Sequence, residues 1–192
     1  MKAGTQCRRR AADGFTLVEI MVVVVIIGIM LTFASLSIGD RAVVDRLDTE
    51  ARRLEQLFHL AQEEAELKGF QLGFRYTDLR YQFLIVSPEG KWVPVPEGPL
   101  RERLIPAPLE LALRVEDRPV PPAQELSAMA EQMQEGKNAP EPEPQVLILS
   151  SGEFTAFTLD VSAAGLTTGY RIGATLLGKI TLERRDEKDG RL

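Results

Sequence analysis

The amino-acid sequence predicts an α+β protein in which one long N-terminal helix packs against small antiparallel sheets. Residues 20–39 contain no charged side chain, and beyond them apolar residues recur every three or four positions as far as Lys68. This spacing is typical of an amphipathic helix. From Phe70 onward the apolar residues recur at every second position, which is typical of half-buried strands. The order of these two patterns gives the fold class.

The uncharged segment is long enough to cross a membrane. At about 1.5 Å per helical residue, roughly 20 residues span the hydrocarbon core of a bilayer. Basic residues precede the segment, so the positive-inside rule leaves the N-terminus in the cytoplasm. We therefore expect residues 15–39 to form a transmembrane helix and residues 40–192 a periplasmic domain of a Gram-negative bacterium. The residues behind this prediction are Lys2, Arg8, Arg9 and Arg10 before the segment, and Ile20, Val24, Gly28 and Leu31 within it.

Two alternative roles of the apolar segment stay open. A secretory signal peptide also has a basic start and an apolar core, and its cleavage site would follow that core, for example at Thr32-Phe33-Ala34. The second is a single-pass anchor that is never cleaved. The signal peptide accounts neither for the acidic residue at position 19 nor for the helical pattern that continues after Asp40.

Glu19 is the least expected residue of this region. An acidic side chain within an apolar membrane segment costs about 2.5–3.5 kcal/mol on insertion scales unless it is paired. Cleavage between Gly14 and Phe15 would create an α-amino group about one helical turn from Glu19. That amine could pair with this carboxylate or with that of a neighbouring subunit. A carboxylate at the level of the lipid headgroups, in contact with water, is the alternative.

A short motif directly before the apolar run reads Gly14-Phe15-Thr16-Leu17-Val18-Glu19. Together with that run, it resembles the prepilin cleavage and methylation motif of type IV pilins and type II secretion pseudopilins. The resemblance implies that prepilin peptidase cleaves after Gly14, removes residues 1–14 as a leader and methylates the new N-terminal Phe15. It also implies that Glu19 forms a salt bridge with the N-terminal amine of a neighbouring subunit during assembly.

The composition argues against several classes of function. The chain carries a formal net charge of −5, and loss of the leader would remove four basic residues and one acidic residue. Phosphate backbones would repel such an acidic chain, so we expect no general binding of nucleic acid. The only cysteine, Cys7, lies in the leader, and the single histidine, His59, has no visible metal-binding or catalytic partner. We expect no catalytic residue, no metal and no cofactor.

We expect the apolar and amphipathic segments to form one helix over residues 15–68. No proline occurs before Pro88, and Lys68-Gly69 supplies a stop because glycine readily takes the left-handed conformation that caps a helix. Residues 40–68 are the amphipathic half of this helix. Their apolar stripe consists of Val43, Val44, Leu47, Ala51, Leu54, Phe58, Ala61 and Ala65.

The rest of the chain is predicted to form two small antiparallel sheets and a surface excursion. Residues 118–145 are rich in proline, and we expect a variable excursion there, with a short helix at residues 124–134. A solvated tail would begin at Arg184. Strands are expected at residues 70–76, 80–86, 92–93 and 109–116 for the first sheet, and at residues 146–149, 154–161, 170–176 and 179–183 for the second.

The C-terminal half contains two further recognisable segments, residues 149–159 (LSSGEFTAFTL) and residues 178–182 (GKITL). With the long helix, the hairpin expected from residues 70–76 and 80–86, and the Trp92 strand, they resemble the H-type minor pseudopilins of type II secretion. The resemblance implies a pilin-like fold and a structural subunit, not an enzyme, at or near the tip of a pseudopilus that helps to export folded proteins across the outer membrane. The partners it implies are prepilin peptidase, the other minor pseudopilins, the major pseudopilin and an inner-membrane assembly platform.

Two other functions stay open. A FimT-like minor type IV pilin, acting in pilus priming or DNA uptake, would share the fold and contact DNA through cationic residues, although acidic residues lie among the candidates. A membrane-tethered periplasmic enzyme would need a group of catalytic side chains that the sequence does not show. The candidates for DNA contact are Arg171, Lys179, Arg184, Arg185, Lys188 and Arg191.

Overall fold

The computed structural model describes residues 16–123 and 142–186. The chain separates into two units, Met1–Asp40 and Arg41–Leu192, and each is described by itself. Several predictions fall outside the described residues. They concern Gly14, Phe15, the short helix at residues 124–134, Lys188 and Arg191.

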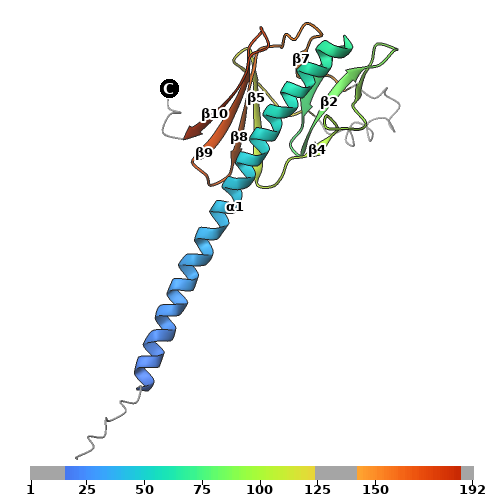
Figure 1. Cartoon of the computed structure of the whole chain (residues 1–192). Coiled ribbons are helices and arrows are strands. Elements are labelled where there is room, and N and C mark those ends of the chain that lie inside the picture. The colour runs from blue at the N-terminus through green and yellow to red at the C-terminus, as the bar shows by residue number, and fades with distance from the viewer. Residues whose placement is uncertain (1–15, 124–141, 187–192) are drawn as a thin grey trace, which may run out of the picture. The chain divides into compact units, whose positions relative to one another are not determined.

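One helix, α1, covers Leu17–Lys68 and contributes residues to both units (Figure 1). It confirms the continuous helix that the sequence predicts. The helix ends as expected, because Gly69 takes a left-handed conformation with φ 68° and its amide donates to the carbonyl oxygen of Ala65 at 3.0 Å.

Within the part of the chain that the structure describes, no helix combines the length and the apolarity that crossing a membrane requires.

The first sheet has the strand order β3-β2-β1-β7, and β4 also pairs with β2. Its strand pairs are antiparallel, and β1 and β2 form the predicted hairpin, in which Phe74 lies opposite Phe83. The strands are β1 (Leu72–Tyr76), β2 (Arg80–Val86), β3 (Trp92–Pro94), β4 (Arg103–Leu104) and β7 (Val146–Ile148).

The second sheet has the strand order β10-β9-β8-β5-β6, again with antiparallel pairs. Its inner face is apolar and its outer face is polar, as the period of two predicts; in β8, for example, Leu159 is buried and Asp160 is only half-buried. The strands are β5 (Leu109–Val115), β6 (Arg118–Val120), β8 (Phe157–Ala163), β9 (Thr168–Ala174) and β10 (Ile180–Asp186).

The membership of the sheets differs from the prediction. β7 was expected in the second sheet, yet it pairs with β1, where Ile148 lies opposite Leu72. β5 was expected in the first sheet, yet it pairs with β8, where Leu113 lies opposite Leu159. The alternation of apolar residues shows that a strand has one buried face, but it carries no information about which distant strand lies beside it.

The expected excursion and tail are both shorter than predicted. Residues 118–120 form β6, which closes a hairpin with β5, and residues 184–186 belong to β10. Backbone pairing reaches these residues because Val120 lies opposite Leu113 and Asp186 lies opposite Thr168. Most of these residues are exposed, as predicted, but they belong to paired strands and not to an irregular excursion or tail.

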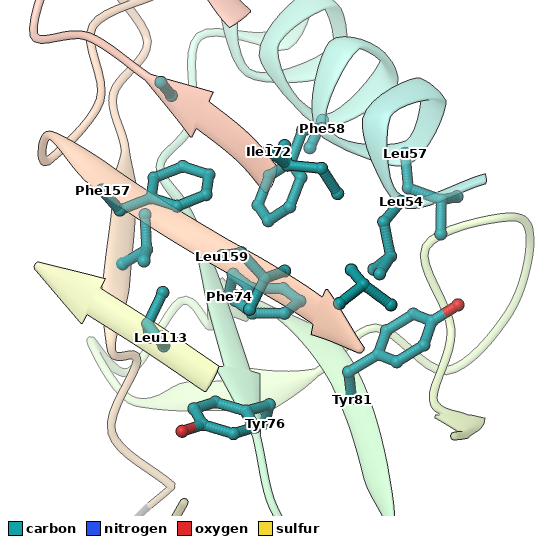
Figure 2. Packing of buried hydrophobic residues seen from close by; sticks show 14 of the residues in the cluster. Leu54, Leu57, Phe58, Phe74, Tyr76, Tyr81, Leu113, Phe157, Leu159 and Ile172 are labelled. Atoms are coloured by element: carbon teal, nitrogen blue, oxygen red, sulfur yellow. The ribbon is translucent and has the colours of Figure 1, made fainter. Parts of the chain in front are cut away.

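The core of the globular unit forms where both sheets pack on the apolar stripe of α1. Leu47, Ala51, Leu54, Phe58, Ala61 and Ala65 are all fully buried, which confirms this part of the stripe. Phe58 lies at the centre of an aromatic cluster, with its ring centroid 4.9 Å from that of Phe74 in the first sheet and 4.8 Å from that of Phe157 in the second (Figure 2). One helical side chain thus joins the two sheets.

Candidate functional site

The candidate site is the start of α1, where the sequence predicts processing and assembly. Thr16 precedes the helix, and its hydroxyl accepts a hydrogen bond from the backbone amide of Glu19 at 3.3 Å. The carbonyl oxygen of Thr16 accepts from the amides of Glu19 and Ile20 at 3.0 and 3.3 Å. Thr16 is therefore the N-cap, and the spacing Thr16-x-x-Glu19 is that of a capping box.

This geometry gives Glu19 a favourable position that the sequence prediction did not include. The residue lies in the first turn of α1, where unpaired backbone amides and the helix dipole favour negative charge by about 0.3–1 kcal/mol. The pattern of threonine followed three residues later by glutamate was available in the sequence as a signal. Its side chain is exposed, so the carboxylate is accessible to a partner.

An apolar surface follows Glu19 along the helix. The large apolar side chains from Leu17 to Leu31 each expose between 43% and 77% of their area. The predicted membrane positions lie within this stretch of α1: Ile20 is 51% exposed, Val24 62% and Leu31 65%, with Gly28 between them. Such a continuous apolar surface is far larger than the isolated apolar residues of ordinary protein surfaces, and it marks a site of contact with lipid or protein.

The cationic candidates for DNA contact are partly neutralised in the structure. Arg171 donates two hydrogen bonds of 2.6 Å to the carboxylate of Asp160, its neighbour on β8. Arg184 lies 3.8 Å from Asp186. The described cations of β9 and β10 are thus interleaved with carboxylates, as the sequence suggested.

The globular unit contains two hydroxyl–carboxylate contacts between α1 and the sheets. The hydroxyl of Tyr170 on β9 donates to Asp48 at 2.8 Å. Hydrogen bonds from Arg52, and then from Tyr170, hold the pKa of Asp48 below its usual range. The hydroxyl of Tyr81 on β2 donates to Glu50 in the same way. These contacts fix the helix to both sheets and were not visible in the sequence.

The described residues contain no group of three or more His, Cys, Asp or Glu side chains that could hold a metal ion. His59 lies on the exposed face of α1.

Comparison with known proteins finds matches to the N-terminal segment and to most of the chain. A family model described as the prokaryotic N-terminal methylation motif matches residues 9–35. The chain is 35% identical over 157 residues to type II secretion system protein H of Pseudomonas aeruginosa, covering 81% of this chain and 86% of that protein. It is 27% identical over 186 residues to the protein of the same name from Aeromonas hydrophila, covering 95% and 99%.

A solved structure agrees with the fold. The crystal structure of the minor pseudopilin EPSH from the type II secretion system of Vibrio cholerae matches with a TM-score of 0.56 at 25% identity, over 73% of this chain and 94% of that chain. These matches confirm the predicted resemblance and the α+β, pilin-like fold. The chain belongs to the type II secretion system protein H family and is a minor pseudopilin of the type II secretion system.

Proposed function

We propose that the chain is a structural subunit at or near the tip of a periplasmic pseudopilus, held at the inner membrane by residues 15–39. In this role it helps to export folded proteins across the outer membrane and catalyses no reaction. Its partners are prepilin peptidase, the other minor pseudopilins, the major pseudopilin and an inner-membrane assembly platform. The processing steps are cleavage between Gly14 and Phe15 and N-methylation of Phe15.

The observation that carries the proposal is the exposed apolar surface of α1 from Leu17 to Leu31. Exposed apolar area costs about 25 cal/mol per Å² in water, so this surface is stable only when lipid or neighbouring helices cover it. The sequence carries no charge from residue 20 to residue 39, which supplies the roughly 20 residues that a full crossing needs. The anchor in this proposal therefore reaches residue 39.

Glu19 has a specific part in this proposal. Its carboxylate pairs with the N-terminal amine that cleavage exposes on a neighbouring subunit, which places the neighbour in register along the helix. The support is that Glu19 is an exposed carboxylate directly before the apolar surface. An unpaired carboxylate in lipid is costly, so assembly that supplies a cation is favoured.

Processing is tested by intact-mass and N-terminal sequencing of the protein from membranes of cells with and without prepilin peptidase. We expect a chain that begins at methylated Phe15 only when the peptidase is present. A chain that still begins at Met1, or one that begins near Ser35, would contradict the proposal and leave a plain anchor or an exported domain.

Two substitutions distinguish ion pairing by the Glu19 carboxylate from helix capping. Glu19→Gln keeps a side chain that can complete a capping box but removes the charge, whereas Thr16→Ala removes the cap and keeps the charge. In cells lacking the native gene, we expect Glu19→Gln to abolish secretion of the exported proteins and Thr16→Ala to retain most of it. Loss of secretion in Thr16→Ala with normal secretion in Glu19→Gln would assign the site to capping alone.

A further inference from the structure

An open hollow of about 480 Å³ lies between two turns of the second sheet. Its floor is apolar and includes Phe157, which is 3% exposed, and Ala174. Leu176 and Leu177, in the turn between β9 and β10, line one rim and are 61% and 89% exposed. We call this hollow the leucine groove. Two exposed leucines beside an apolar floor form a surface that gains stability when a partner covers it.

The leucine groove is held in place by the core and by α1. The ring of Phe157 packs on Phe58 of the helix, and the turn that carries Leu177 is fixed by Gln62, whose amide donates to the carbonyl oxygen of Gly178 at 3.1 Å. A groove fixed in this way loses little conformational freedom when a partner binds.

The opposite rim carries two carboxylates on an unusual turn. Glu116 and Asp117 join β5 to β6, with Val115 opposite Arg118, and both have left-handed backbones with φ 49° and 64°. A two-residue hairpin turn of this kind favours Asn-Gly, because ordinary side chains are strained at positive φ. Within the described part of the chain, neither carboxylate takes part in an ion pair. The turn keeps two negative charges beside the groove despite a backbone cost.

We propose that the leucine groove is the docking site for a segment of a neighbouring, different pseudopilin that brings a large apolar side chain with a Lys or Arg next to it. This inference rests on the proposed function and adds a contact surface to it. The apolar side chain covers Phe157 and the two leucines, and the cation pairs with Glu116 and Asp117. A second copy of this chain fits less well, because its net charge of −5 opposes the acidic rim.

The most informative variant removes both negative charges of the rim and at the same time relieves the backbone strain of the turn. Glu116→Asn with Asp117→Gly gives the residue pair that the turn favours, so we expect the midpoint of thermal unfolding to rise. We expect the dissociation constant for the partner pseudopilin to rise about tenfold, the change that corresponds to 1.4 kcal/mol. Leu177→Ser should weaken binding by a similar factor without changing the unfolding midpoint. Binding is measured between the detergent-solubilised full chain and each purified full-length pseudopilin of the same secretion system.

The turn between β1 and β2 supplies a matched control, since Asp78 and Leu79 are also an exposed acidic residue and an exposed leucine. Asp78→Asn and Leu79→Ser should leave binding unchanged. In cells, a photo-reactive residue at position 177 should form an adduct with another pseudopilin, and the same residue at position 79 should not.

Unchanged binding of the partner pseudopilin by the stabilised double variant would overturn the docking site. An adduct at position 177 that forms only with a second copy of this chain, or only with an exported protein, would overturn it too. The proposed function is tested separately by whether the unaltered chain restores secretion to cells lacking it. If it does and the groove variants bind normally, only the docking site is wrong.

Discussion

The hydroxyl of Tyr81 donates a hydrogen bond of 2.5 Å to the carboxylate of Glu50, which exposes only 2% of its surface. Arg53 donates to the other oxygen of the same carboxylate at 2.7 Å. Glu50 lies on α1 and Tyr81 on β2, so the contact joins the helix to the first sheet. A buried carboxylate is tolerated only when its oxygens are paired, and here both are.

Tyr81→Phe should lower the free energy of unfolding by about 1–3 kcal/mol, because it leaves one buried oxygen of Glu50 without its donor. Urea unfolding of the detergent-solubilised full chain, followed by the fluorescence of the single Trp92, measures this loss. Tyr170→Phe is the matched control. Its partner Asp48 keeps Arg52 and is 35% exposed, so we expect a loss below about 1 kcal/mol. Equal losses of unfolding free energy in the two variants would show that the burial of Glu50 does not strengthen its contact with Tyr81.

Stability should fall at alkaline pH. Burial, and then the hydrogen bond to Glu50, raises the pKa of Tyr81 well above its usual range, and burial also raises the pKa of Tyr170. Because an unfolded tyrosine titrates near pH 10, the folded chain holds these protons more tightly, and the stability they contribute is lost as the pH rises above about 10. We expect a slope of up to about 1.4 kcal/mol per pH unit for each tyrosine. Urea unfolding between pH 8 and 11 measures it, and Tyr81→Phe should reduce the slope.

Phe58→Ala should lower the free energy of unfolding by about 3–5 kcal/mol, because it empties the centre of the aromatic cluster that both sheets share. Leu67→Ala, on the same helix but 86% exposed, should change it by less than about 0.5 kcal/mol. The same urea experiment measures both variants. A small effect of Phe58→Ala would show that the two sheets do not depend on this contact.

The pair Asp160–Arg171 should contribute modestly to stability. Both side chains are 29% exposed, and the two residues lie opposite each other on neighbouring strands. A double-mutant cycle with Asp160→Asn and Arg171→Gln should give a coupling energy of about 0.5–1 kcal/mol that decreases at high salt. A coupling that is independent of salt would mean that the pair acts through packing.

Local features of the fold were predictable because they depend on neighbouring residues. The stripe from Leu47 to Ala65, the stop at Gly69 and the hairpin around Asp78 each follow from spacing or from a glycine. The partners of β5 and β7 were not, because their pairing depends on residues far along the chain. Gln145 illustrates the difference: its side chain accepts from the amide of Tyr76 and donates to the carbonyl oxygen of Pro121, and the sequence offers no signal for either contact.

The N-terminal site could be predicted in part. Glu19 is conspicuous because a charge at the start of an apolar run is unusual, and its spacing from Thr16 also fits a capping box, in which the structure shows Thr16 as the N-cap. The leucine groove could not be found in this way. Its rim residues Glu116 and Asp117 are poor candidates for a tight turn. The turn that places them in the same groove as Leu177 therefore could not be predicted from the sequence.

Gln62 connects the helix to the two turns beside the groove. Its amide nitrogen donates to the carbonyl oxygens of Gly152 at 2.8 Å and of Gly178 at 3.1 Å. The segment that carries Leu177 is thereby coupled mechanically to α1. A force on the helix would therefore act on both turns, and through them on the proposed docking groove.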